Sequence, residues 1–189
     1  MTPTILCKVL FGSSLFFSQS WLNANPEIEK QAAPICVEVA EKAIAQDVNP
    51  AVAVALAYSE SRFKENAKSK VGAVGPMQVI PKWTCPNRRR RGCDLVQAGV
   101  DTLKDHLLTY GCDKELSRFS KRLKRTKGIE VFRDWAKTVP ACTEPDWETV
   151  VCHYNSGLNC RDRTFPRLVI KRAIYLVDLL EEEGYELAW

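Results

Sequence analysis

One acidic residue follows a segment that is otherwise apolar, and this position could give its carboxyl an unusual pKa. Residues 51–57 are only alanine, valine and leucine, and Glu60 lies three residues beyond them. A helix that is apolar on every side belongs in a protein core. At its C-terminal end a carboxyl meets both desolvation and the negative end of the helix dipole, and both raise its pKa. A carboxyl that keeps its proton near neutral pH can donate it to a glycosidic oxygen and afterwards act as a base.

Two further segments carry polar and turn-forming residues that could complete a site around Glu60. The first, residues 69–81, contains two closely spaced glycines and therefore favours a tight loop. The second is the run His-Tyr-Asn-Ser-Gly at residues 153–157. Each segment alone is a weak signal, and Glu60 alone is more simply an exposed acid paired with Arg62 or Lys64. The three in this order, separated by helical segments, form a specific pattern.

Together these segments resemble the soluble lytic transglycosylase family, whose domain is similar to goose-type lysozyme. The family pattern is Glu-Ser, then Gly-x-x-Gly-Leu-Met-Gln, then Ala-Tyr-Asn-x-Gly on a later helix, and the resemblance covers residues 48–180. It implies a mainly α, lysozyme-like domain with a substrate groove. It also implies cleavage of the β-1,4 bond between N-acetylmuramic acid and N-acetylglucosamine in peptidoglycan, leaving 1,6-anhydro ends, with no metal and no organic cofactor.

The resemblance assigns a role to each residue that matches the family pattern. The residues implied in catalysis are Glu60, Ser69 and Tyr154. The residues implied in substrate binding are Gly75, Met77, Gln78 and Asn155. Ser69 would polarise the N-acetyl group of the substrate, and the Tyr154 hydroxyl would reach toward Glu60. The plainer interpretations are a core methionine at Met77, packing alone for Tyr154, and a packed histidine at His153, where the family has a small apolar residue.

Two other functions stay open at this stage. A hydrolytic muramidase of the same fold would need a second carboxylate in the groove. Residues 72–81 contain no acid, which favours the transglycosylase, although Asp94 or Asp101 could fold into the site. A non-catalytic peptidoglycan-binding assembly module would keep the groove without the reaction, and an intact Glu60 argues against it.

The first 24 residues predict export. A charged start is followed by an apolar run over residues 9–17 and by an uncharged stretch to Ala24, which is typical of a secretory signal peptide and too short for a membrane span. We expect cleavage after Ala24, leaving one catalytic domain over residues 25–189 in a secreted or periplasmic location. Exported chains keep disulfides. We expect Cys85 to pair with Cys93; seven cysteines remain after cleavage, so at least one would lack a partner within the chain.

The spacing of apolar residues predicts helices and no long strands. The expected helices cover residues 27–46, 50–61, 94–110, 149–154 and 168–183. Asn49 is the expected N-cap before Pro50. Residues 128–147 show no regular pattern and belong to a segment, 112–147, that is longer than the corresponding link in the family. The chain of 189 residues is therefore expected to form one mainly α domain.

Charge is unevenly distributed, with 27 Lys and Arg against 23 Asp and Glu in the whole chain. Basic residues concentrate at residues 88–91 and 118–127. They could attract an anionic surface such as a wall polymer, or simply form a solvated face. The arginines lack interleaved aromatics, so specific nucleic-acid binding is not expected. The expected partners are peptidoglycan strands, and family members of this size commonly open the wall for a secretion, conjugation or phage injection apparatus.

Overall fold

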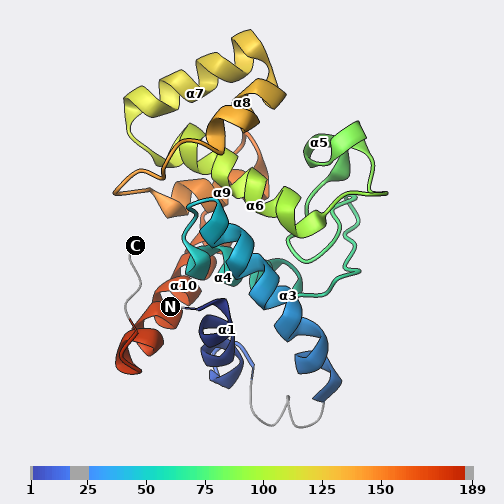
Figure 1. The fold of residues 1–189 in the computed structure, drawn as a ribbon, viewed down its shortest axis with the longest axis vertical. Coiled ribbons are helices and arrows are strands. Elements are labelled where there is room, and N and C mark those ends of the chain that lie inside the picture. Colours follow the sequence, from blue (N-terminus) through green and yellow to red (C-terminus); the bar gives the residue numbers. More distant parts are fainter. Residues whose placement is uncertain (1, 18–25, 186–189) are drawn as a thin grey trace.

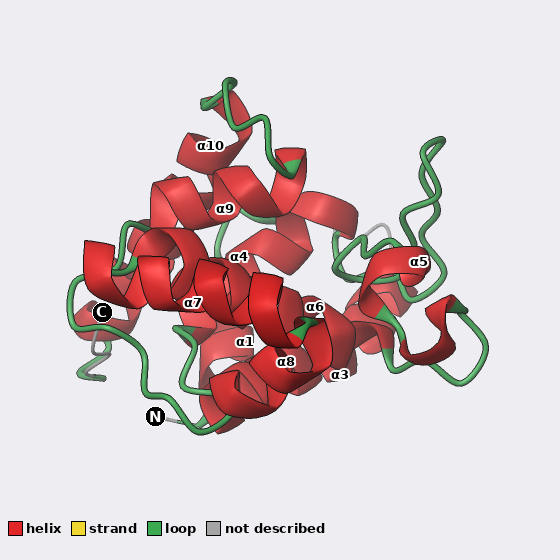
Figure 2. Cartoon of the chain, turned by 90° about the horizontal axis from the view of Figure 1, so that it is seen from above, coloured by secondary structure: helices red, strands yellow, loops and turns green. Residues whose placement is uncertain are grey.

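The computed structural model describes residues 2–17 and 26–185, and within these ranges the chain folds into packed helices (Figure 1). The helices are α1 (Pro3–Gly12), α3 (Pro26–Ala45), α4 (Pro50–Ser61), α5 (Pro81–Thr84), α6 (Leu95–His106), α7 (Lys114–Lys127), α8 (Ile129–Ala136), α9 (Trp147–Ser156) and α10 (Thr164–Glu182). Over the same ranges no strand forms, and two isolated bridges join Lys68 with Val74 and Val74 with Val79. The expected mainly α fold is confirmed (Figure 2).

Helix α4 is the centre of the core. The Asn49 side chain accepts hydrogen bonds from the amides of Ala51 and Val52 at 2.9 and 3.1 Å, which confirms the expected N-cap. All eight residues from Ala51 to Tyr58 are buried. Helices α3 and α10 pack against α4, so its apolar surface is covered (Figure 1). Residues 59–61, at its C-terminal end, are only partly buried.

Helix α6 lies beside α9 and ends in a single π turn, Leu107–Gly111. The Asp94 side chain accepts a hydrogen bond from the Gln97 amide at 2.8 Å and caps the start of α6. At the end of the π turn, a Cβ on Gly111 would lie 2.3 Å from Val150 of α9, so only glycine allows this approach. The helix expected over residues 94–110 is therefore present, with its final turn widened.

The long segment between α6 and α9 forms two helices, α7 and α8, at one end of the molecule (Figure 1). A disulfide between Cys112 and Cys142 joins the ends of this segment. The expectation of irregular structure over residues 128–147 is wrong for Ile129–Ala136, which form helix α8. Phe132 and Ala136 of α8 are buried against Leu108 in a small second core. Eight residues with so short an apolar face form a helix here because that face has a partner distant in the sequence.

All eight cysteines are paired. The expected disulfide between Cys85 and Cys93 is confirmed, and the others join Cys7 to Cys36, Cys112 to Cys142 and Cys152 to Cys160. The expectation of an unpaired cysteine does not hold for the full chain, because Cys7 takes the place of the missing partner.

The amino-terminal segment packs into the core in this structure. Leu10, Phe16 and Phe17 are buried, and the Tyr58 hydroxyl of α4 donates a hydrogen bond to the Phe16 carbonyl. Both phenylalanine rings meet the Tyr58 ring edge-on, with centroids 4.9 and 5.1 Å away. The cleavage position expected after Ala24 lies outside the described residues. None of the described helices is both long and apolar enough for a membrane crossing.

These contacts predict what removal of residues 1–24 would do. The shortened chain should expose one reactive thiol, Cys36, because the other six cysteines remain paired. It should also lose about 3 kcal/mol of stability from the missing disulfide. Maleimide labelling of oxidised protein followed by intact-mass measurement would show one adduct on residues 25–189 and none on the full chain. The control variant Cys36→Ser should abolish the adduct, and persistence of labelling there would contradict the assignment.

Candidate active site

The end of α4 opens into a groove of about 650 Å³. Among the residues that line it are five of the sequence-predicted site residues: Glu60, Ser69, Gln78, Tyr154 and Asn155. They come from α4, from the loop over residues 69–79 and from α9, so the fold brings together segments almost a hundred residues apart. The structure thus gathers most of the predicted site around one cavity.

The last turn of α4 is tied directly to the glycine loop. The Ser61 hydroxyl donates a hydrogen bond to the Pro76 carbonyl at 2.7 Å. Arg62 follows in the left-handed conformation with φ at 54°, which ends the helix and reverses the chain. The hydrogen bond from Ser61 therefore fixes the end of α4, and with it the backbone of Glu60, relative to the glycine loop.

Burial gives the Glu60 carboxyl the property expected from its place in the sequence. Glu60 is half-buried, and desolvation raises the pKa of its carboxyl to about 7. Of the described residues that line the groove, Glu60 is the one with a carboxyl group. A carboxyl of this pKa exchanges its proton near neutral pH and can serve as both acid and base.

The loop after α4 makes a compact turn beside Glu60. The Ser69 hydroxyl oxygen accepts a hydrogen bond from the Ala73 amide at 3.0 Å, which leaves its proton available to the groove. Gly75 has φ at +78°, and a Cβ there would lie 2.7 Å from Leu95. Gln78 lines the groove from a left-handed backbone conformation, with φ at 50°, and its side-chain amide donates to the Gly75 carbonyl at 2.9 Å. Strained backbone of this kind is typical of functional sites.

Tyr154 connects α9 to this loop from below. Its hydroxyl donates a hydrogen bond to the Met77 carbonyl at 2.9 Å. Burial raises the pKa of Tyr154 well above its usual range, and the negative charge of Glu60 raises it further. Tyr154 is therefore a proton-bearing neighbour of Glu60, although the hydrogen bond of its hydroxyl in this structure goes to the loop backbone.

Two predicted binding residues do not line the groove. Met77 was expected in its wall, but its side chain is fully buried in the core. Its sulfur fits against α6 because Gly99 has no side chain; a Cβ there would lie 2.5 Å from the Met77 sulfur. Gly75 is also beneath the surface, where it allows the turn. Both residues support the loop that carries Gln78 instead of contacting a ligand in the groove.

Two aromatic residues outside the family motifs, Trp83 and His106, also line the groove. Trp83 lines it from α5 and His106 from α6. Burial lowers the pKa of His106 to about 4, so its imidazole is neutral at neutral pH. His153 also lines the groove, and its ring stacks on Tyr110 with centroids 3.7 Å apart. No local spacing marks Trp83 or His106, because they join the site only through packing.

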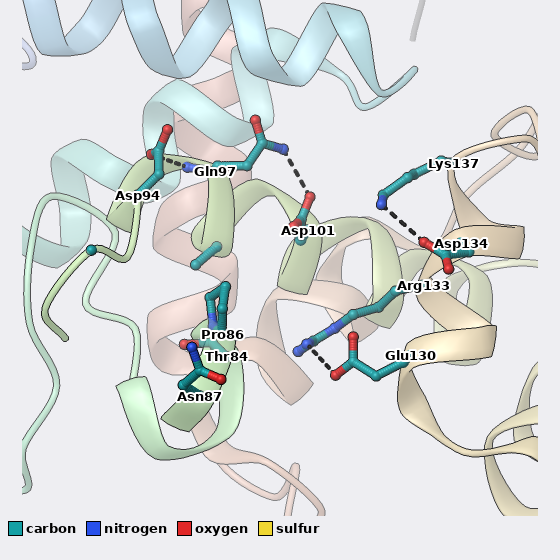
Figure 3. A pocket seen from close by; sticks show the side chains of 12 residues that line it. Thr84, Pro86, Asn87, Asp94, Gln97, Asp101, Glu130, Arg133, Asp134 and Lys137 are labelled. Atoms are coloured by element: carbon teal, nitrogen blue, oxygen red, sulfur yellow. Dashed lines mark hydrogen bonds and ion pairs between the residues drawn. The ribbon is translucent and has the colours of Figure 1, made fainter. Parts of the chain in front are cut away.

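A second pocket, of about 570 Å³, lies between α6 and α8 (Figure 3). Asp94 and Asp101 line this second pocket and not the groove. Asp94 forms an ion pair with Lys42. The Asp101 carboxylate accepts a hydrogen bond from the side-chain amide of Gln97 at 2.8 Å. The possibility that one of these aspartates completes a two-carboxylate site is therefore excluded in this structure.

A family model described as the transglycosylase SLT domain matches residues 38–168. The matched segment begins in α3, contains Glu60, the glycine loop and the Tyr154-Asn155 pair, and ends in α10. It also contains the whole of α7 and α8. Comparison with curated proteins and with solved structures gave no match.

The raised pKa of Glu60 predicts a pH-dependent effect of Glu60→Gln on stability. From about pH 4.5 to 7 the folded carboxyl keeps its proton while the unfolded one loses it, so ionisation progressively destabilises the native wild type. Glu60→Gln should match wild type near pH 4 and be more stable at pH 8, by up to about 3 kcal/mol. Urea unfolding at both pH values would measure this, with the exposed Glu65→Gln as control. Equal differences at both pH values would show that Glu60 is not desolvated.

The close packing of Gly75 on Leu95 predicts a second stability difference. Gly75→Ala adds a Cβ that collides with Leu95 at a left-handed backbone position, so it should cost about 2–4 kcal/mol. Gly72→Ala is the matched control, because Gly72 also has a positive φ, at +87°, but open space around it. It should cost only about 1 kcal/mol. Denaturant midpoints would compare the two, and equal losses would argue against the tight contact.

Proposed function

Because the chain belongs to the transglycosylase SLT domain family, we propose that it is a peptidoglycan lytic transglycosylase. It would cleave the β-1,4 bond between N-acetylmuramic acid and N-acetylglucosamine and leave 1,6-anhydro-N-acetylmuramic acid ends. The observation that carries the proposal is a groove with one carboxyl group among its described residues, held by burial at a pKa of about 7. A hydrolase that uses two carboxylates would need a second one in the same groove.

In the proposed reaction Glu60 acts first as an acid and then as a base. The protonated carboxyl donates its proton to the glycosidic oxygen, and the bond from that oxygen to C1 of N-acetylmuramic acid breaks. The oxygen of the substrate's own N-acetyl group stabilises the positive charge at C1. The Glu60 carboxylate then takes the proton of the C6 hydroxyl of N-acetylmuramic acid, and the C6 oxygen forms the new bond to C1. The proton returns to Glu60 and no water is consumed.

The residues around Glu60 support this sequence of steps. Ser69 has its hydroxyl proton available because its oxygen already accepts from the Ala73 amide, so it can donate to the N-acetyl group. Tyr154 stays protonated near Glu60 and keeps the loop against α9. Gln78 and Asn155 present amide groups to the groove for hydroxyl and N-acetyl groups of the glycan. These side chains require neither metal nor organic cofactor for the proposed chemistry.

We also propose where the protein works and what it contacts. The three disulfides within residues 25–189 fit a location outside the cytoplasm, where such bonds persist. Residues 1–24 would direct export, with residues 25–189 forming the catalytic domain. The exposed arginines at 88–91 and the basic face of α7 would attract the anionic wall. Local opening of the wall for a secretion, conjugation or phage injection apparatus is the biological role that fits a small domain.

The chemistry can be tested by the mass of the products. Oxidised wild-type protein incubated with purified peptidoglycan should release muropeptides one water lighter than the products of a hydrolytic muramidase. Glu60→Gln, which keeps the size of the side chain, should release at least about a thousandfold less, because no other carboxyl in the groove can move the proton. Mass spectrometry of the soluble fragments measures both.

The alternative outcomes distinguish the remaining functions. Hydrated fragments from the wild type would leave the family assignment intact and make the protein a muramidase. Binding to peptidoglycan without any fragments would indicate a non-catalytic assembly module. Glu65→Gln serves as the control variant, because Glu65 is exposed and lies outside the groove.

A further inference from the structure

We propose that Trp83 forms a sugar-stacking subsite at the rim of the groove, and that Arg133 of the segment between α6 and α9 holds it in position. This inference rests on the proposed function, since it assumes a glycan in the groove. The ligand would be an N-acetylhexosamine ring of the strand, packed with its apolar C–H face on the indole. It adds a binding surface that the family motifs do not include, and it gives a role to helix α8.

The exposure of Trp83 is unusual for its residue type. The exposed fraction of Trp83 is 66%. Trp83 lines the groove from α5, whereas Tyr154 lines it from α9. The other two tryptophans in the described residues are less exposed: Trp147 is 7% exposed, and Trp135 is partly buried and packs against Phe119 and Phe132. An exposed aromatic side chain at the edge of a groove offers a flat apolar surface with which a ligand in the groove can pack.

The Trp83 side chain is exposed, but the backbone of α5 that carries it is held in place. Pro81 begins the four-residue helix α5, and the Thr84 hydroxyl donates to the Ile80 carbonyl at 3.1 Å. The disulfide between Cys85 and Cys93 closes the loop that follows. A rigid aromatic side chain loses little conformational freedom on binding, and this favours affinity.

Helix α8, which lies in the segment between α6 and α9, contacts the backbone of α5 through a hydrogen bond. The Arg133 guanidinium of α8 donates to the Trp83 carbonyl at 3.2 Å. Figure 3 shows the Arg133 side chain extending from α8 across the second pocket toward Thr84 and Pro86, next to Trp83 in the chain. Arg133 is therefore a positioning residue, which acts on the glycan only through α5.

The ring itself has the chemistry that a sugar face needs. The Lys82 ammonium lies 4.8 Å from the Trp83 ring centroid, so a cation already occupies part of the electron-rich surface. The C–H groups of a pyranose ring carry a small partial positive charge, and they are apolar, so they can also pack on this surface. No charged group of the glycan is required, and the subsite would accept N-acetylglucosamine polymers as well as peptidoglycan.

Binding can be measured without turnover in the Glu60→Gln background. The probe is a soluble β-1,4-linked N-acetylglucosamine hexamer, titrated by calorimetry. Trp83→Ala should weaken its Kd about fivefold to tenfold, and Trp83→Tyr should restore most of the loss because a ring remains. Phe119→Ala is the matched control, since Phe119 is 49% exposed but lies on α7 outside the groove. Unchanged affinity in Trp83→Ala would overturn the subsite.

The positioning role of Arg133 has its own test on peptidoglycan. Arg133→Ala should raise KM about threefold or more while kcat stays near wild type, and Arg133→Lys should recover part of the loss. Lys171→Ala, which removes an exposed basic side chain on α10 that lines neither pocket, should change neither constant. A fall in kcat with constant KM would overturn the role of Arg133. A wild type that cleaves normally while Trp83→Ala binds like its parent would refute this subsite alone, whereas a wild type that releases no fragments would refute the proposed function first.

Discussion

The burial of α4 up to its last turn is the constraint on which the site depends. Eight consecutive residues of this helix are buried under α3 and α10, and Glu60 follows them closely in the chain. The carboxyl therefore lies where water is scarce and its charged form is disfavoured, so its pKa rises to about 7. The hydrogen bond from Ser61 to Pro76 then fixes the glycine loop relative to that carboxyl. The packing that stabilises the domain therefore also raises the pKa of the Glu60 carboxyl.

The groove has a floor and a rim that are supported separately. Tyr154 and Met77 join α9 to the underside of the loop, and Gly99 leaves the space that Met77 fills. The rim is held from a different direction, by the disulfide after α5 and by Arg133 of α8. Because the floor and the rim have different supports, we expect substitutions to alter the proposed glycan binding and the proposed proton transfer independently.

Much of this arrangement follows from short stretches of sequence. Helix α4, its Asn49 cap, the tight turn at Gly75 and the short disulfide loop each depend on neighbouring residues, and each was predicted. The residues that were misplaced depend on distant partners. Helix α8 forms against Leu108, and Met77 enters the core because α6 carries a glycine. No local periodicity contains these partners.

The sequence by itself determined the helical class, the place of Glu60 at the end of a buried helix and the reason for the raised pKa of its carboxyl, because an apolar helix must be buried whatever surrounds it. Only the tertiary structure decided which groups share the groove with Glu60. Packing directs Asp94 and Asp101 into another pocket and brings Trp83 to the rim. These outcomes depend on the directions in which helices cross and on which side chains fill the space between them. That information is distributed over the whole chain and absent from any one motif.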